Sequence, residues 1–307
     1  MQRLIVLVGV PASGKSTIAE NIKDESFDIH SSDAIRKELY GSEQILGNPA
    51  EIFNLMYKRT LDSLNSGKNV IYDSTNISRK DRIRLLNFIS KINNLSKECI
   101  IAAATIDTIF ERNKNRERKV PENVILNMLK NFNMPLINEG FDNITVVNTS
   151  DLDDCETMID KYCKNLTHDN PHHTLDVDKH MHAALDYLKN NYPNEYNDYV
   201  MKNAVLLHDI GKGYAKTFLN SKNIVTEVAH YYGHAGIGAY MLLSANFRSE
   251  EERIKIATLV NFHMRPLEAW LNSNKAELND RRLLGEELYH DIKIINDCDC
   301  NADSSKQ

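Results

Sequence analysis

Short apolar runs alternate with helical patterns over the first half of the chain. The runs are rich in Ile and Val and partly continuous in apolar character, which is typical of strands buried on both faces of a sheet. The expected strands are Leu4–Val10, Phe27–His30, Asn69–Asp73, Glu98–Ala104 and Asn143–Asn148. The expected helices are Lys15–Ile22, Ala50–Leu64, Ser78–Ile92, Thr108–Arg118 and Glu122–Asn131. This alternation predicts βαβ units and a parallel sheet flanked by helices.

The strand signal stops after Ser150, and helical patterns continue to the end of the chain. Asp153–Asn165 is expected as a helix that closes the first domain, and the polar stretch 167–174 is expected as a linker. The later expected helices are Val177–Asn190, Asp198–Gly211, Gly233–Ser244, Glu250–His263, Leu283–Tyr289 and His290–Asn301. We therefore predict two domains, an α/β domain over residues 1–165 and an all-α helical bundle over residues 166–307.

Composition agrees with an ordinary globular protein. Hydrophobic residues make up 42% of the chain and charged residues 26%. The net charge of −6 argues against binding nucleic acid through bulk positive charge, although local basic patches remain open. No apolar run approaches the roughly 18 residues of a membrane span, and Leu4–Val10 is too short for a signal peptide. We expect a cytoplasmic protein without a membrane partner, whose 5 cysteines are reduced thiols.

A phosphate-binding loop follows the first expected strand. Residues 9–16, GVPASGKS, match G-x-x-x-x-G-K-[ST] between a strand and a helix, the setting that makes this motif credible. Backbone N–H groups of such a loop wrap the β-phosphate of ATP or GTP. Lys15 is expected to reach the β- and γ-phosphates and Ser16 to bind Mg²⁺. The nucleotide-binding candidates are Gly9, Ser13, Gly14, Lys15, Ser16, Thr17 and Asp73.

Three further features bear on how the bound nucleotide is used. Asp33 and Arg36 follow the second strand, at the sheet edge where α/β proteins bind ligands, so Asp33 is a candidate base and Arg36 a candidate anion contact. Asp33 is equally compatible with a favourable first-turn charge of a helix. Asp73 ends the third strand, where it would organise Mg²⁺ or cap the next element. Arg112 and Arg116 share one helix face, and arginines of this kind stabilise a migrating phosphoryl group.

Together these residues resemble the polynucleotide 5′-kinase branch of the P-loop phosphotransferases over roughly residues 3–150. The matching pieces are GVPASGKST, the D-x-x-R of Asp33 and Arg36, the DSTN segment from Asp73, and the R-N-x-x-R of Arg112 and Arg116. The resemblance implies that Asp33 is the general base for a 5′-hydroxyl and that Arg36 contacts the nearest acceptor phosphate. It implies that Arg112 and Arg116 clamp the phosphates of ATP. Small-molecule kinases that share the loop remain an alternative.

Histidine is concentrated in the second half of the chain, since His30 alone among 11 His precedes residue 168. Helices that each offer an imidazole or a carboxylate build metal sites in bundle cores. The candidate ligands are His180, His208, Asp209, His234, His263 and Asp299, with Asp297 as an alternative to the last. This set lacks Cys and suits Mn²⁺, Fe²⁺, Ni²⁺, Co²⁺ or Mg²⁺. We interpret His168, His172, His173 and His290 as surface residues and leave His182 and His230 open.

The motif His208-Asp209-Ile-Gly-Lys212 and its partners resemble the HD superfamily of metal-dependent phosphohydrolases over roughly residues 172–305. The resemblance implies that His180, His208, Asp209 and a late Asp are the core ligands. His234 and His263 match the extra histidines of members that bind two metals. Lys212 matches a lysine that faces the scissile phosphate, and Arg265 is a second candidate phosphate contact.

A kinase and a phosphohydrolase on one chain are productive when they act on opposite ends of a broken strand. The resemblance implies an end-healing enzyme that phosphorylates 5′-OH ends and hydrolyses 2′,3′-cyclic phosphate or 3′-phosphate ends of RNA or DNA. Its functional partner would be a nucleic-acid ligase. One alternative is a nucleoside or nucleotide kinase fused to an HD nucleotidase. Another is an ATP-dependent switch without catalysis, which the retained carboxylates disfavour. The oligomeric state stays undetermined.

Overall fold

The computed structural model describes residues 1–171 and 174–302, so His172 and His173 lie outside the described residues. The chain divides into two compact units. The first comprises Met1–Ile125 and Pro135–Asp151, and the second comprises Leu126–Met134 and the rest of the chain from Leu152. By packing, residues 152–165 therefore belong with the second unit. The expected domain boundary at 165/166 stays a prediction.

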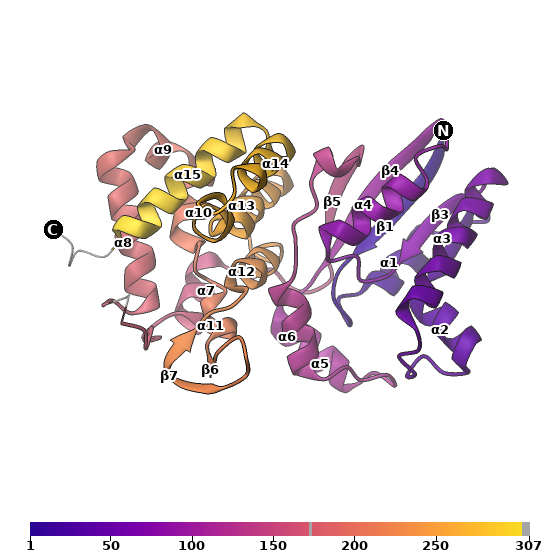
Figure 1. The fold of residues 1–307 in the computed structure, drawn as a ribbon, viewed down its shortest axis with the longest axis horizontal. Coiled ribbons are helices and arrows are strands. Elements are labelled where there is room, and N and C mark those ends of the chain that lie inside the picture. Colours follow the sequence, from indigo (N-terminus) through magenta and orange to yellow (C-terminus); the bar gives the residue numbers. More distant parts are fainter. Residues whose placement is uncertain (172–173, 303–307) are drawn as a thin grey trace. The chain divides into compact units, whose positions relative to one another are not determined.

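The first unit is built on a five-stranded parallel sheet in the order β2-β3-β1-β4-β5. Its strands are β1 (Gln2–Val8), β2 (Phe27–Ser31), β3 (Asn69–Asp73), β4 (Leu95–Ala103) and β5 (Asn143–Asn148). Leu4 to Val8 of β1 are fully buried, because this strand lies in the middle of the sheet. Strands and helices alternate along the chain, from indigo to magenta in Figure 1. The predicted α/β fold is confirmed.

The helices of the first unit begin and end at residues that suit these positions. They are α1 (Lys15–Ile22), α2 (Ser32–Tyr40), α3 (Pro49–Asn65), α4 (Arg79–Phe88), α5 (Ile106–Lys114), α6 (Glu122–Lys130) and the 3₁₀ turn η1 (Ile137–Glu139). Asn48 caps α3 by accepting from the Ala50 N–H at 3.0 Å, and Thr105 caps α5. Gly41, at φ 78°, ends α2 in the left-handed conformation that glycine favours. Helix α2 is not among the helices expected above, although Asp33 was compatible with the first turn of a helix.

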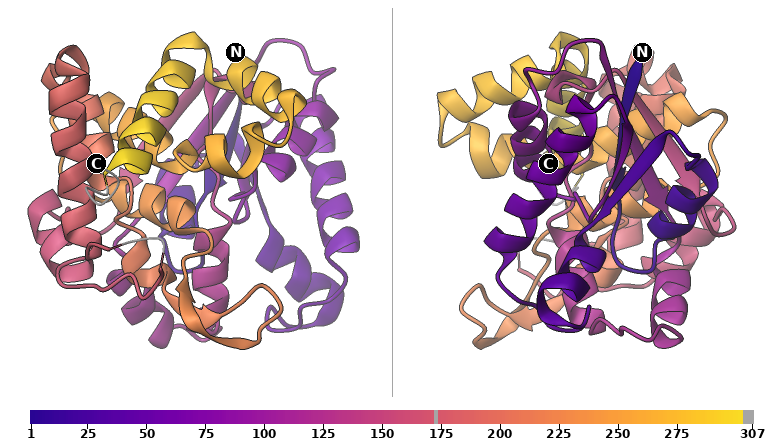
Figure 2. Two further views of the ribbon diagram at one scale, coloured as in Figure 1. Left: turned by 60° about the vertical axis from the view of Figure 1, so that its left-hand side comes forward. Right: turned by 90° about the vertical axis from the view of Figure 1, so that its right-hand side faces the viewer.

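The second unit is helical, as predicted, with one small hairpin. Its helices are α7 (Cys155–Tyr162), α8 (Val177–Asn191), α9 (Pro193–Asn197), α10 (Tyr199–Leu207), α11 (Lys212–Ala215), α12 (His234–Leu242), α13 (Glu250–Phe262), the π-helix η2 (Pro266–Trp270), α14 (Asn274–Leu284) and α15 (Glu286–Asn301). The antiparallel strands β6 (Thr217–Leu219) and β7 (Val225–His230) form a hairpin that projects from these helices in Figure 2.

Two expectations for the second unit were wrong in detail. Strands do occur after Ser150, because the hairpin of β6 and β7 interrupts the helices. Leu283–Tyr289 is not one helix, because Gly285 adopts φ 81° and separates α14 from α15. No helix within residues 1–171 and 174–302 combines the length and apolar character that crossing a membrane requires.

The segment after α6 packs within the second unit. Phe132 meets Tyr240 edge to face with ring centroids 5.3 Å apart, and the Asn261 side chain donates to the Phe132 carbonyl at 3.0 Å. Residues 152–165 are held there too, since the rings of Tyr162 and Tyr214 lie 5.1 Å apart. The second unit is thus assembled from two stretches that are separated along the chain.

Candidate functional site

The phosphate-binding loop follows β1, at the point where the strand order of the sheet reverses. Gly9 and Gly14 have φ values of 155° and 95°. A Cβ on Gly9 would lie 2.5 Å from Ser13 Oγ, and a Cβ on Gly14 would lie 2.8 Å from the Thr149 side chain. Both positions therefore require glycine, and the loop carries Lys15, Ser16 and the exposed Thr17 into the start of α1.

Lys15, Ser16 and Asp73 come together at the carboxyl edge of the sheet. Asp73 ends β3 directly beside β1, and the Ser16 hydroxyl donates to its Oδ2 at 3.2 Å. The Lys15 ammonium donates to the Val10 carbonyl at 3.0 Å. Burial lowers the pKa of Lys15 and raises that of Asp73, and each group opposes the shift of the other. A serine hydroxyl beside a carboxylate fits the oxygen ligands that Mg²⁺ takes with nucleotide phosphates.

Asp33 lies in the first turn of α2, between two arginines. Nη1 of Arg36 and Nη1 of Arg118 both donate to Asp33 Oδ1 at 2.5 Å. Arg36 also donates to the Leu46 carbonyl at 3.4 Å. This role of Arg118 was not predicted, because nothing in local spacing shows that Arg118 reaches a carboxylate 85 positions earlier. A carboxylate flanked by two cations suits a substrate in which a hydroxyl group lies next to an anionic group.

The two predicted lid arginines take separate positions. Arg112, on α5, donates to Thr149 Oγ1 at 2.8 Å and to the Thr149 carbonyl. Arg116 follows α5 and lies close enough to Lys15 and Asp73 to lower the pKa of each. Arg116 therefore lies on the side of the phosphate loop, whereas Arg118 lies on the side of Asp33.

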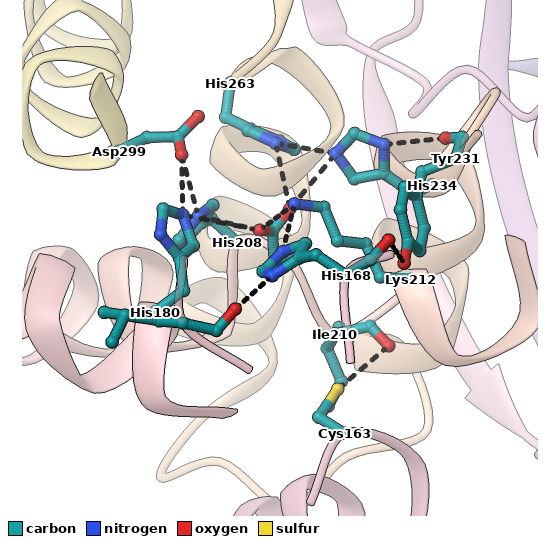
Figure 3. Close-up of polar contacts among 12 residues, drawn as sticks. Cys163, His168, His180, His208, Ile210, Lys212, Tyr231, His234, His263 and Asp299 are labelled. Atoms are coloured by element: carbon teal, nitrogen blue, oxygen red, sulfur yellow. Dashed lines mark hydrogen bonds and ion pairs between the residues drawn. The ribbon is translucent and has the colours of Figure 1, made fainter. Parts of the chain in front are cut away.

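The second unit brings all six predicted metal ligands into one cluster (Figure 3). Asp209 stands at its centre, because its two oxygens face different partners. Asp209 Oδ2 lies 3.3 Å from His208 Nε2 and 3.6 Å from His180 Nε2, and Oδ1 lies 3.2 Å from His234 Nε2. Candidate ligand atoms form two groups that share Asp209, one with His180, His208 and Asp299 and the other with His234 and His263.

Three of these histidines are oriented in the same way. Nδ1 of His208, His234 and His263 lies 2.7–2.9 Å from the carbonyl oxygen three residues earlier in each case. A carbonyl can only accept, so Nδ1 carries a hydrogen in each ring, and Nε2 is the atom that faces the cluster and is free to bind a metal once it is deprotonated. Backbone anchoring of this kind fixes the ring orientation of metal-binding histidines.

The nitrogen and oxygen atoms of the cluster are better suited to binding a divalent metal ion than to sharing protons among themselves. Nε2 of His234 and Nε2 of His263 face each other at 3.1 Å, so a cation or a proton must lie between two lone pairs. Burial acts against a charged His208, but Asp209 and Asp299 outweigh it and raise the His208 pKa to about 10. Burial together with His234 lowers the pKa of His263 to about 3. Buried carboxylates with Nε2-directed imidazoles and no Cys are typical of Mn²⁺, Fe²⁺, Ni²⁺ or Co²⁺.

The late carboxylate in the cluster is Asp299. Its Oδ1 lies 2.9 Å from His180 Nε2 and 3.4 Å from His208 Nε2. Asp297 instead accepts a hydrogen bond from the Tyr192 hydroxyl at 2.8 Å and belongs to neither ligand group. Position on α15 separates the two, because residues two apart on a helix point to different sides.

Glycines allow the helices that carry the ligands to approach closely. A Cβ on Gly211 would lie 2.1 Å from the His234 carbonyl oxygen and 2.5 Å from the Gly238 nitrogen. A Cβ on Gly236 would lie 2.7 Å from the Leu129 carbonyl oxygen. Gly211 thus lets the Asp209 segment lie directly against α12, which begins with His234.

Lys212 and His168 border the metal cluster. The Lys212 ammonium lies 2.6 Å from Asp209 Oδ2 and 3.1 Å from His168 Nε2. The expectation that His168 is a surface residue was wrong, because its exposed fraction is 2%. His290 is exposed, as expected. Arg265 donates to the buried Asp280 at 2.8 Å, so its guanidinium is a partner of that carboxylate.

Fold and site together define a P-loop phosphotransferase domain joined to a helical domain with a metal-binding cluster. Comparison with known families agrees with both parts. Residues 4–135 match the family described as an AAA domain, and residues 172–300 match the HD domain. The chain therefore carries a P-loop kinase domain of the AAA type followed by an HD domain. The first implies ATP with Mg²⁺, and the second implies a divalent metal.

Individual relatives match one part of the chain at a time. A bifunctional polynucleotide phosphatase/kinase from Schizosaccharomyces pombe is 24% identical over 160 residues, 50% of this chain and 36% of that protein. An L-seryl-tRNA(Sec) kinase from Methanococcus maripaludis is 31% identical over 170 residues, 49% of this chain and 61% of that protein. The chain thus spans less than two thirds of either relative. A solved Pnkp1/Rnl/Hen1 RNA repair complex gives a TM-score of 0.37 at 20% identity, covering 41% of this chain and 42% of that one.

Proposed function

We propose that this protein is a bifunctional end-healing enzyme of nucleic acids, with RNA as its main substrate. The kinase domain transfers the γ-phosphate of ATP to a 5′-hydroxyl end. The HD domain hydrolyses a 2′,3′-cyclic phosphate or a 3′-phosphate end. Hydrolysis of the cyclic phosphate gives a phosphomonoester, and hydrolysis of the monoester releases inorganic phosphate and leaves a 3′-hydroxyl. A 5′-phosphate and a 3′-hydroxyl are the ends that a ligase joins, so the functional partner is a nucleic-acid ligase.

The observation that carries the kinase half is the environment of Asp33. A base for an attacking hydroxyl needs a carboxylate near the phosphate loop, and Asp33 acts on the pKa of both Lys15 and Asp73 there. Arg36 and Arg118 flank that carboxylate. Two guanidinium groups beside the base favour an acceptor that carries a phosphodiester next to its hydroxyl, as a polynucleotide end does. A neutral sugar or nucleoside would leave this charge unused.

The phosphohydrolase half rests on the ligand cluster around Asp209. His180, His208 and Asp299 would hold one metal, and His234 and His263 would hold a second with Asp209 shared. A divalent metal in such a site supplies Lewis-acid polarisation of a phosphate and a nucleophile from water at neutral pH. Lys212 brings a buried ammonium to the same place, where it neutralises phosphate charge.

A panel of end-labelled RNA, DNA and mononucleotides, assayed with ATP and several divalent metals, tests the proposal. We expect Lys15→Ala and Asp33→Ala to abolish 5′-phosphorylation and to leave 3′-end hydrolysis unchanged. His208→Ala and Asp209→Ala should do the reverse. Faster turnover of nucleosides or mononucleotides than of oligonucleotides would instead establish a nucleotide-metabolism enzyme. Absence of phosphoryl transfer to every oligonucleotide would overturn the kinase assignment.

A further inference from the structure

His168 lies beside the metal cluster, in the segment between α7 and α8, and outside both groups of candidate ligands. It is the one histidine whose expected surface position the structure contradicts within residues 1–171 and 174–302. Its ring meets the His180 ring edge to face at a centroid distance of 5.6 Å. Figure 3 shows His168 next to the ammonium end of Lys212.

The hydrogen bonds of His168 fix its tautomer. Nδ1 lies 2.6 Å from the Leu175 carbonyl oxygen, which can only accept, so the hydrogen is on Nδ1. Nε2 therefore holds a lone pair and accepts from the Lys212 ammonium at 3.1 Å. The Tyr231 hydroxyl donates to the His168 carbonyl at 2.7 Å and ties the backbone down. His168 is thus a rigid neutral acceptor aimed at one cation.

Lys212 needs such an acceptor. Lys212 is 5% exposed, and its ammonium contacts Asp209, His168 and the face of the Tyr231 ring, 5.4 Å from the ring centroid. Asp209 is also the carboxylate shared by both candidate metal groups, so its charge is not available to Lys212 alone. The ammonium group of a long, flexible lysine side chain has no fixed position unless another group holds it.

We propose that His168 is a positioning residue of the phosphohydrolase site. It accepts a hydrogen bond from Lys212 and holds the ammonium at the edge of the metal cluster, where it meets a phosphate oxygen of the substrate. His168 itself touches neither metal nor substrate. The inference rests on the proposed function of the HD domain, since it assigns Lys212 to phosphate.

The test compares two replacements of His168 in the full-length chain. His168→Phe keeps an aromatic ring and removes the acceptor, whereas His168→Gln restores an acceptor oxygen near the position of Nε2. We expect His168→Phe to lower kcat/KM for a 2′,3′-cyclic nucleotide about tenfold, the effect of one misplaced charged hydrogen bond. His168→Gln should stay within about threefold of the wild type. His182→Phe, at an exposed histidine of α8, is the matched control and should change nothing.

A double-mutant cycle with Lys212→Met distinguishes positioning from simple packing. In the Lys212→Met background, His168→Phe should have less than about a twofold further effect, because the cation it acts through is gone. Metal content, measured by elemental analysis, should remain unchanged in every variant. If the fold-losses in kcat/KM of the two single variants multiply in the double variant, or if His168→Phe loses metal, the inference is overturned.

Binding of inorganic phosphate gives a readout that does not depend on turnover. The metal-loaded chain is titrated calorimetrically, with a non-hydrolysable ATP analogue and Mg²⁺ filling the phosphate loop. We expect His168→Phe and Lys212→Met each to weaken phosphate binding about five- to tenfold, without further loss when combined. If the wild type hydrolyses no phosphate ester but this coupling is present, the proposed function fails and the positioning role stands. If the wild type hydrolyses a phosphate ester but the effects of His168→Phe and Lys212→Met are independent, only the positioning role is overturned.

Discussion

At the scale of single residues, each site depends on a few atoms whose freedom the backbone removes. His208, His234 and His263 are each anchored through Nδ1 to a carbonyl three residues earlier, so their Nε2 atoms converge without further adjustment. Gly211 likewise restricts the site, through the backbone. It brings the Asp209 segment against α12 at a distance that no side chain would allow.

Gly211→Ala tests this close approach. The new Cβ would lie 2.1 Å from the His234 carbonyl oxygen, so α12 has to move away from Asp209. We expect metal affinity to fall about tenfold or more and unfolding stability to fall by about 1–3 kcal/mol. Metal titration and urea unfolding measure the two effects. Gly285→Ala is the control, because it has open space and only a strained φ of 81°. It should cost about 1–3 kcal/mol, because φ 81° with ψ 169° is a conformation that almost only glycine adopts, and it should leave metal affinity unchanged.

Arg118→Ala tests the acceptor side of the kinase site. Arg118 pairs with Asp33, whereas Arg116 lies near Lys15, so the loss should affect the acceptor more than ATP. We expect the KM for a 5′-OH oligonucleotide to rise about tenfold and the KM for ATP to change less than about twofold. Steady-state kinetics measure both. Lys114→Ala, at a largely exposed lysine nearby, should change neither constant. A rise confined to the KM for ATP would instead place Arg118 with the nucleotide.

Residue type decided which parts of the sites could be predicted. The phosphate loop and the six candidate ligands have distinctive chemistry and spacing, so the sequence was sufficient to select them. His168 and Arg118 were missed because each acts through one ion or hydrogen-bond partner, 44 and 85 positions away along the chain. Such partners depend on tertiary packing, which local patterns do not contain.

At the scale of elements, strongly periodic segments were predicted well and short ones were not. The strands β2, β3 and β5 begin where the sequence pattern predicts, although β3 alone among these three is largely buried and β2 and β5 lie at the edges of the sheet. The hairpin of β6 and β7 was missed. Phe218 and Val225 on it are 42% and 76% exposed and Ala229 is the one buried residue of its two strands, so the hairpin has too little buried apolar surface to give a strand pattern.

A buried ion pair joins α4 to the 3₁₀ turn η1. Arg82, on α4, donates through Nε and Nη2 to both oxygens of Glu139 at 2.7 Å, and both side chains are fully buried. Arg82 Nη1 also donates to the Asn76 carbonyl at 2.9 Å, just after Asp73. The pair therefore supports the backbone that follows a candidate Mg²⁺ residue.

Arg82→Met should destabilise the first unit by about 3–5 kcal/mol, because it leaves the Glu139 carboxylate buried without its main partner. Urea unfolding followed by far-UV circular dichroism measures this loss. The only tryptophan of the chain, Trp270, lies in the second unit, so its fluorescence transition is an internal control and should not move. An equal shift of both signals would contradict a local role. Lys80→Met, at an exposed neighbour on α4, controls for charge removal.

At the scale of the whole molecule, the chain contains two compact units with separate ligands. The P-loop lies in the first and the metal cluster in the second. Helix α6 contributes residues to both, since Ile125 belongs to the first unit and Leu126 to the second. Whether the chain unfolds in one step or two is therefore a direct question about α6.

Ligand-specific thermal shifts answer it, because a ligand stabilises only the cooperative unit that binds it. We expect Mn²⁺ at about 100 times its dissociation constant to add about 2.7 kcal/mol to the transition reported by Trp270. An ATP analogue with Mg²⁺ should raise only the transition that appears in circular dichroism and is absent from Trp270 fluorescence. His263→Ala should remove the Mn²⁺ shift, and Lys15→Ala should remove the nucleotide shift. A single transition that both ligands raise equally would mean that α6 joins the two units into one cooperative structure.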